Sequence, residues 1–219
     1  MIPIYFLGGS DMSNIEELLH TLPTTAVSDA LAGNTNLNAA IKPLKDQYHI
    51  VGRAVTVRLP IGENDALLEA IRIAQPGEIL VVDAKGDTNR AVAGDFIVSL
   101  MKGMGIQGLV VDGVIRDIQA IRDLDFPVFS LGTTVAAGNK FGGGVIQVPI
   151  AVGGMSVQPG DFIVGDTDGV VVIPQAKVDE VVQKALKKIE KDEARAQSVA
   201  GGKDEIIAYL DQTLGREKV

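Results

Sequence analysis

The sequence predicts an α/β fold in one domain of 219 residues. Between residues 49 and 132, runs rich in valine and isoleucine alternate with segments whose apolar residues recur at helical spacing, which is typical of layered α/β domains. From residue 142 to residue 174, short strands and turns replace the helices and indicate a mixed sheet. No Pro/Ser-rich linker divides the chain, so we expect a single domain over residues 1–219, with a tail at about 1–12 and a helical segment at 175–219.

Two short helices are expected before the first strand. Ser13, with Glu16 three residues later, has the spacing of a capping box. Thr25 or Ser28 is expected to cap a second helix over "DALAG". The β-rich run at 49–59 then predicts the first long strand.

The middle of the chain alternates helices and strands. We expect helices at 65–74, from about 94 to 105, and at 116–124, and strands at 78–84, 108–113 and 127–132. The apolar stripe of the tail predicts a long amphipathic helix over 177–195. Gly201 and Gly202 should end this helix before a last short one.

Composition excludes several function classes. The chain has no cysteine, which rules out disulfides, Cys-based zinc sites and thiol catalysis and fits the cytoplasm, where we expect the protein. Only His20 and His49 are present, and we expect neither to be catalytic, so a metal would need oxygen ligands, which favour Mg²⁺ or Mn²⁺. The net charge of −8 argues against nucleic acid as the partner. We expect no signal peptide and no membrane span.

The stretch "AGDFIVSL" could bind an anion. If a helix starts near Gly94, the free N–H groups of Phe96 and Ile97 point at one spot and suit a carboxylate or a phosphate. The alternative is that Asp95 only caps the helix and complements its dipole.

The stretch "GLVVDGVIRD" sets Arg116 and Asp117 side by side after a strand, where α/β folds bind their ligands. Arginine can grip a carboxylate with its forked donors, and an aspartate can ligate a hard divalent ion. A salt-bridged or capping pair at a helix start is the alternative, and the pattern alone does not decide. Lys140, in a glycine-rich loop, either contacts the substrate or is simply solvated.

Six segments together resemble the RraA-like family: "SDAL", "VGRAVTV", "PGEILVVD", "RAVAGD", "GLVVDGVIRD" and "PGDFIVGDTDGVVVIP". The family includes 4-hydroxy-4-methyl-2-oxoglutarate / 4-carboxy-4-hydroxy-2-oxoadipate aldolases, some formerly labelled demethylmenaquinone methyltransferases. The resemblance covers residues 16–214. It implies a swivelling β/β/α three-layer domain with mixed sheets and a long C-terminal helix, and a homotrimer or hexamer with its site between subunits.

The resemblance also implies a class II mechanism, in which Mg²⁺ or Mn²⁺ stabilises a pyruvate enolate released from an anionic 4-hydroxy-2-oxo dicarboxylic acid. Oxaloacetate decarboxylation would pass through the same enolate. The implied metal ligand is Asp117. The implied catalytic residues are Arg116, Asp95 and Lys140; the substrate-binding residues are Gly94, Phe96, Ile97 and Arg116; and Asp192 or Glu193 would come from a neighbouring subunit.

One position departs from the aldolase pattern. Ala120 stands where the family has an acidic residue, and Asp123 is the nearest substitute. The surroundings of the metal are therefore altered, which predicts weaker metal binding or a different substrate. Two alternatives remain open. One is an imine mechanism through Lys140. The other is a non-catalytic regulatory protein resembling the ribonuclease E inhibitor, against which the retained Asp117 argues.

Overall fold

The computed structural model describes residues 12–215. Its helices are α1 (Met12–Thr21), α2 (Thr24–Ala30), α3 (Asp65–Ile73), α4 (Asp95–Gly103), α5 (Ile118–Leu124), the short 3₁₀ helix η1 (Gln175–Lys177), α6 (Val178–Gln197) and α7 (Lys203–Thr213). Its strands are β1 (Lys42–Pro43), β2 (Ile50–Arg58), β3 (Ile79–Ala91), β4 (Gly108–Ile115), β5 (Val128–Ser130), β6 (Gly132–Thr133), β7 (Val145–Ile146), β8 (Ile150–Val152), β9 (Met155–Val157), β10 (Phe162–Asp166) and β11 (Gly169–Ile173).

Nine strands form one mixed sheet in the order β1-β5-β4-β3-β2-β10-β11, with β6 beside β4 and β7 beside β2. Strands β2 to β5 pair in parallel, because each is connected to the next through a helix or a long crossover. Strands β10 and β11 add to the far edge of β2 in antiparallel pairing. The predicted α/β fold with a mixed sheet is confirmed.

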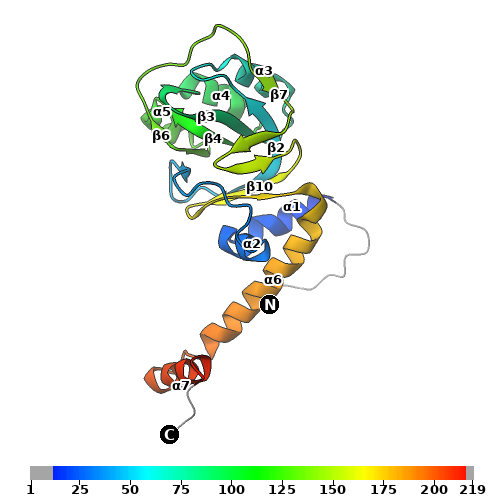
Figure 1. Cartoon of the computed structure of the whole chain (residues 1–219), viewed down its shortest axis with the longest axis vertical. Coiled ribbons are helices and arrows are strands. Elements are labelled where there is room, and N and C mark those ends of the chain that lie inside the picture. The colour runs from blue at the N-terminus through cyan, green and yellow to red at the C-terminus, as the bar shows by residue number, and fades with distance from the viewer. Residues whose placement is uncertain (1–11, 216–219) are drawn as a thin grey trace.

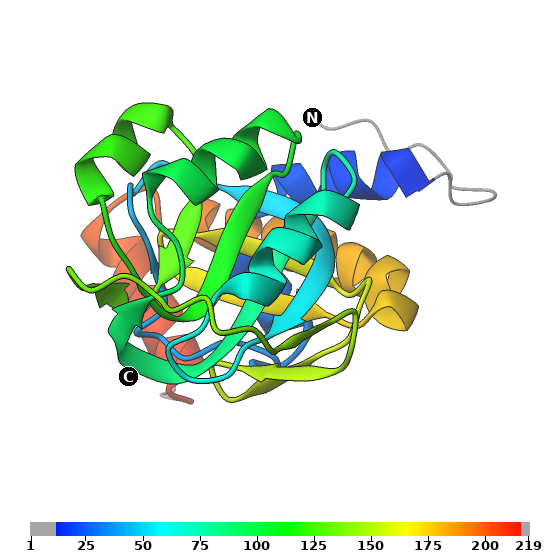
Figure 2. The same cartoon turned by 90° about the horizontal axis from the view of Figure 1, so that it is seen from above.

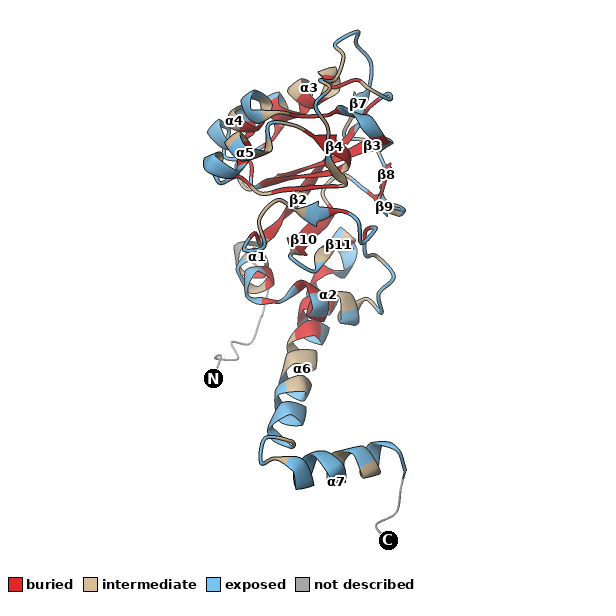
Figure 3. Ribbon diagram, turned by 90° about the vertical axis from the view of Figure 1, so that its left-hand side faces the viewer, coloured by how far each residue is buried: buried red, intermediate tan, exposed pale blue. Residues whose placement is uncertain are grey.

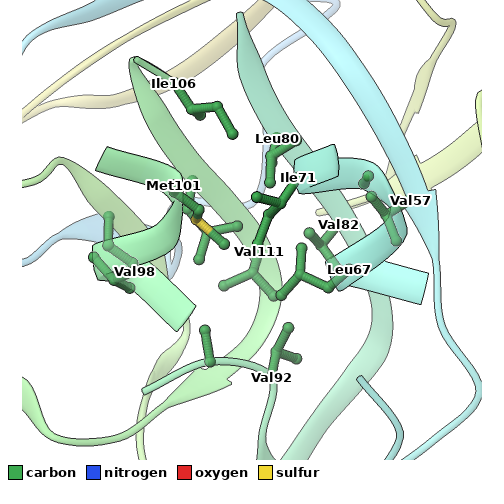
Figure 4. Close-up of a cluster of buried hydrophobic side chains, with 14 of the residues drawn as sticks. Val57, Leu67, Ile71, Leu80, Val82, Val92, Val98, Met101, Ile106 and Val111 are labelled. Carbon is green, nitrogen blue, oxygen red and sulfur yellow. The ribbon is translucent and has the colours of Figure 1, made fainter. Parts of the chain in front are cut away.

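Helices α3, α4 and α5 cover one face of the parallel strands, with α4 and α5 side by side (Figures 1 and 2). The core beneath them combines helix residues with alternate residues of β3 and β4 (Figure 4). Leu67 of α3 and Val98 and Met101 of α4 are fully buried there, against Val82 and Val111 of the sheet. A second apolar cluster on the opposite face involves β8 and β9, and a third joins α1, α2 and α6 to β10 and β11. Alternate strand residues thus serve different layers, as period-two side-chain alternation requires.

The two predicted N-terminal caps are wrong. Ser13 lies inside α1, and both Thr25 and Ser28 lie inside α2, which begins directly after Pro23. The backbone N–H of Thr24 donates instead to Asp166 Oδ2 at 3.0 Å, across 142 residues of sequence. A carboxylate at the end of β10 therefore supplies the acceptor that a local side chain was expected to provide.

Two central boundaries also differ from the prediction. Strand β3 continues to Ala91 instead of ending near residue 84, with register shifts in its pairing to β4. Helix α5 begins at Ile118, two residues late, because Asp117 adopts a left-handed conformation at φ 58° and ψ 38°. Arg116 and Asp117 therefore lie at a corner between strand and helix.

The C-terminal helices are confirmed. The first half of α6 is buried against α1 and α2, whereas its second half and α7 point away from the body of the molecule and are largely exposed (Figures 1 and 3). Between residues 12 and 215, no helix combines the length and apolar character that a bilayer crossing requires.

Candidate functional site

The Arg116–Asp117 pair lies at the C-terminal end of β4. The N–H of Arg116 donates to Ala93 O at 3.0 Å, which joins this corner to the segment that leads into α4. Arg116 Nε lies 3.2 Å from Asp117 Oδ2, and the two side chains are 40% and 38% exposed. Within residues 12–215, no hydrogen bond engages the terminal guanidinium nitrogens of Arg116. The pair is thus partly exposed to solvent, and the terminal N–H groups of Arg116 are available to a ligand.

Gly94 brings the start of α4 directly against this pair. A Cβ atom at Gly94 would lie 2.4 Å from Asp117 Oδ2 and 3.2 Å from Arg116 Nε, so no larger residue fits without displacing the carboxylate. Helix α4 begins at the next residue, as the sequence predicts. The predicted helix N-terminus and the predicted Arg-Asp pair therefore lie against each other, although Gly94 precedes Arg116 by 22 positions in the sequence.

Asp95 is the first residue of α4, whose N-cap is Gly94, and its side chain makes a local contact. Its Oδ1 accepts the N–H of Phe96 at 2.7 Å. The amide of Phe96 would have to change partners before it could bind a substrate oxygen. The side chain of Phe96 is 69% exposed, and Ile97 follows in the first turn.

A cavity of about 430 Å³ opens between α4 and α5. It is lined by Asp95, Phe96, Ser99, Ala120, Asp123 and Leu124. Both Ala120 and its predicted substitute Asp123 face this space together with Asp95, and Asp123 Oδ1 accepts a hydrogen bond from Gln119 at 3.0 Å. Sequence reasoning missed Ser99. Its spacing four residues after Asp95, on the same helix face, could have indicated it.

Within residues 12–215, neither Lys140 nor the C-terminal acids make a hydrogen bond or ion pair with Arg116 or Asp117. Lys140 is exposed, and within residues 12–215 its side chain makes no ion pair or hydrogen bond. Asp192 and Glu193 lie on the projecting half of α6, beside a separate cavity of about 320 Å³ between α2 and α6. A hydrogen bond from Lys188 and the charge of Arg195 lower the pKa of Asp192. Their contribution to a neighbour's site stays a prediction.

The donor set can be tested against a divalent metal. The described chain holds no group of three or more His, Asp and Glu side chains that could enclose a metal ion. The Asp117 carboxylate lies beside Arg116 and the start of α4, and it is 38% exposed. Magnesium commonly binds through one or two carboxylates and keeps several waters, so a single aspartate suits a partly hydrated ion completed by the substrate.

Comparison with known proteins gives a consistent result. The RraA-like family, described as aldolase/RraA, matches residues 24–172. A relative from Halalkalibacterium halodurans, named "Putative 4-hydroxy-4-methyl-2-oxoglutarate aldolase", is 51% identical over 89% of this chain and 92% of its own.

Solved structures share the fold. RraAS2 from Streptomyces coelicolor, described as an unusual member of the RNase ES inhibitor RraA protein family, is 30% identical, with a TM-score of 0.77 over 84% of this chain and 97% of its own. The RNA-processing inhibitor RraA from Thermus thermophilis is 28% identical, with a TM-score of 0.64 over 69% and 92% of the two chains.

Proposed function

The chain belongs to the RraA-like family, and on that premise we propose that it is a divalent-metal-dependent lyase that releases pyruvate from 4-hydroxy-2-oxo dicarboxylic acids. The observation that carries the proposal is the contact of Gly94 with Arg116 and Asp117. It brings a helix N-terminus, a guanidinium and a carboxylate to one half-open corner. Support for a lyase comes from the 51% identical relative that bears an aldolase name.

Arg116 is suited to bind the anionic end of a 2-oxo acid. Its Nε is engaged by Asp117, which orients the guanidinium, while the terminal nitrogens remain available for two parallel hydrogen bonds to a carboxylate. The same donors would stabilise negative charge that develops on the enolate oxygen after carbon–carbon cleavage. Backbone N–H groups at the start of α4 add to this stabilisation.

Asp117 would hold Mg²⁺ or Mn²⁺, which when bound supplies Lewis acidity at the 2-oxo oxygen. Asp95 holds the Phe96 N–H beside the cavity and would have to release it when substrate binds, and Lys140 would meet the distal carboxylate of a dicarboxylate substrate. Because aldol cleavage and oxaloacetate decarboxylation both yield enolpyruvate, we propose oxaloacetate decarboxylase activity at the same corner.

We further propose a homotrimer or hexamer in which Asp192 or Glu193 of a neighbouring copy reaches this corner. The motivation is that the distal half of α6 leads away from the corner of its own chain (Figure 1). Light scattering of the purified protein tests the assembly, and a monomer at catalytic concentrations would contradict it.

The function is tested by screening 2-oxo acids with purified protein and detecting pyruvate through lactate dehydrogenase. We expect release with Mg²⁺ or Mn²⁺ and its loss after chelation. Inactivation by borohydride in the presence of pyruvate, together with indifference to chelator, would instead support an imine on Lys140. If no 2-oxo acid yields pyruvate with either metal, the lyase proposal fails.

A regulatory role is the second candidate, since one structural neighbour is described as an RNA-processing inhibitor and another as an unusual member of the RNase ES inhibitor RraA protein family. Ala120 favours it, because the cavity lacks an acid at this position. Thermal unfolding with Mg²⁺ and oxalate, a pyruvate enolate analogue, separates the two. A ligand that binds only the folded state raises the Tm, so the lyase proposal predicts an increase and the regulatory one no change at millimolar ligand.

A further inference from the structure

The loop between β6 and β7, residues 134–144, carries Lys140 and is fastened to the body at two places. Ala91, at the end of β3, donates its N–H to Ala136 O at 2.9 Å. Farther along, Asn139 donates its N–H to Gly62 O at 2.7 Å. The loop therefore runs beside both the segment that enters α4 and the turn that enters α3.

The turn that enters α3 contains a buried carboxylate. Glu63 is only 8% exposed, and its Oε2 accepts the N–H of Phe141 at 2.9 Å. Within the described chain, no cation pairs with this carboxylate. Burying an acidic group without a counter-ion costs free energy. The hydrogen bond from the peptide N–H that follows Lys140 offsets part of this cost.

The next residue reaches the other half of the site. Asn64 is 5% exposed, and its Nδ2 donates to Val92 O at 3.3 Å, two residues before Gly94. Adjacent side chains thus hold the Lys140 loop and the entrance to α4. Before Lys140, the loop is also held by the N–H of Asn64, which donates to Asn139 O at 3.3 Å. After Lys140, the Glu63 contact comes at a weakly held segment, because Phe141 is 87% exposed and three glycines with positive φ follow it at residues 142–144.

We propose that Glu63 is a positioning residue, which holds the peptide between Lys140 and Phe141 so that the Lys140 ammonium group meets the distal carboxylate of the substrate. The proposal rests on the proposed function for its kinetic consequence, but the fastening itself is independent of activity. It predicts that loss of the carboxylate loosens this loop and weakens substrate binding while leaving the Arg116–Asp117 corner intact.

The kinetic experiment compares Glu63→Ala with Glu63→Gln, whose amide oxygen can still accept the hydrogen bond. For Glu63→Ala we expect KM for the dicarboxylate to rise about tenfold with little change in kcat, because a hydrogen bond to a charged acceptor is lost away from the reacting atoms. Glu63→Gln should recover most of this loss. In a Lys140→Ala background, Glu63→Ala should have no further effect on KM if Glu63 acts through Lys140.

A proteolysis experiment needs no activity. Trypsin cleaves after Lys140, and the scissile peptide contains the N–H that Glu63 accepts. We expect Glu63→Ala to speed cleavage at Lys140 about tenfold relative to other tryptic sites, and Glu63→Gln to stay near wild type. The matched control is Glu69→Ala, which removes an exposed glutamate that pairs with Arg72 on α3.

The two experiments distinguish a failure of the proposed function from a failure of the positioning role. A wild-type protein that releases no pyruvate overturns the proposed function, whereas unchanged cleavage at Lys140 in Glu63→Ala overturns the positioning role. Faster cleavage at all sites alike would also overturn it, because Glu63 would then only stabilise the fold.

Discussion

The corner at the start of α4 and the C-terminal arm, residues 187–213, both expose charged residues, but they are supported differently. Beneath the corner, Val98 and Met101 are fully buried against the sheet (Figure 4). In the arm, Asp192 pairs with Lys188 of the same helix, Lys188 also reaches Asp29 of α2 at 3.4 Å, and no residue of α7 is buried (Figure 3). Charged side chains that lie over a well-packed core keep a fixed geometry. Charged side chains on a solvated helix are not held in one geometry.

The largest expected effect on activity comes from Asp117, and substitutions of Asp117 and Arg116 should alter activity in different ways. Asp117→Ala should lower pyruvate release on the order of a thousandfold, because the metal ligand and the partner that orients Arg116 are both lost. Arg116→Lys keeps the charge but loses the forked donors, so it should raise KM while metal affinity persists. Steady-state kinetics with metal titration measure both. Near wild-type turnover of Asp117→Ala would remove the metal-ligand assignment.

Two glycines at the ends of α4 test whether the corner depends on close packing. Gly94→Ala would place a Cβ atom 2.4 Å from the Asp117 carboxylate, and the displacement should lower kcat/KM about a hundredfold. At Gly103 an added Cβ meets nothing within 4 Å, so Gly103→Ala should keep activity and raise stability by about 0.5–1 kcal/mol. If both variants are equally active, the corner is looser than the contact implies.

Truncating one apolar side chain in each region compares how much each region's packing contributes to the free energy of unfolding. Met101→Ala should cost about 2–5 kcal/mol of unfolding free energy, because it leaves a cavity under α4. Ile207 of α7 is 44% exposed, so Ile207→Ala should change stability by about 0.5 kcal/mol or less. Urea unfolding provides both values. An equally large loss for Ile207→Ala would contradict the comparison and indicate that α7 is buried in an assembly.

The smallest effect is expected at the end of α1, where the rings of His20 and His49 meet edge to face at 5.8 Å. Burial, with a smaller contribution from the charge of His20, lowers the pKa of His49 below its usual 6.5, whereas Asp166 opposes the shift. The unfolded state then binds more protons below pH 6.5. The contribution of His49 to stability is therefore fully present above pH 6.5 and is lost as the pH falls toward the folded-state pKa.

The measurement is urea unfolding at pH 7.5 and at pH 5.5. The wild type should lose more stability between these values than His49→Gln, which cannot titrate. Equal losses in the two proteins would assign the acid sensitivity to other groups.

Local pattern was sufficient to predict much of the fold, including the helix start and the strand end that carry the proposed site. Alternating apolar runs predicted the parallel strands and their helices, and glycine followed by aspartate predicted the start of α4. The amphipathic stripe predicted α6 within a few residues. These features depend on neighbours within one or two turns, so a single sequence carries them.

The tertiary structure decided which distant groups meet. The acceptor for the Thr24 amide is Asp166, the residue that closes on the Arg116–Asp117 corner is Gly94, and the buried Glu63 holds the peptide after Lys140. Residue type indicates that a backbone N–H needs an acceptor or that a carboxylate needs a donor. Which partner supplies it across tens of residues follows only from how the sheet and its crossovers bring chain segments together.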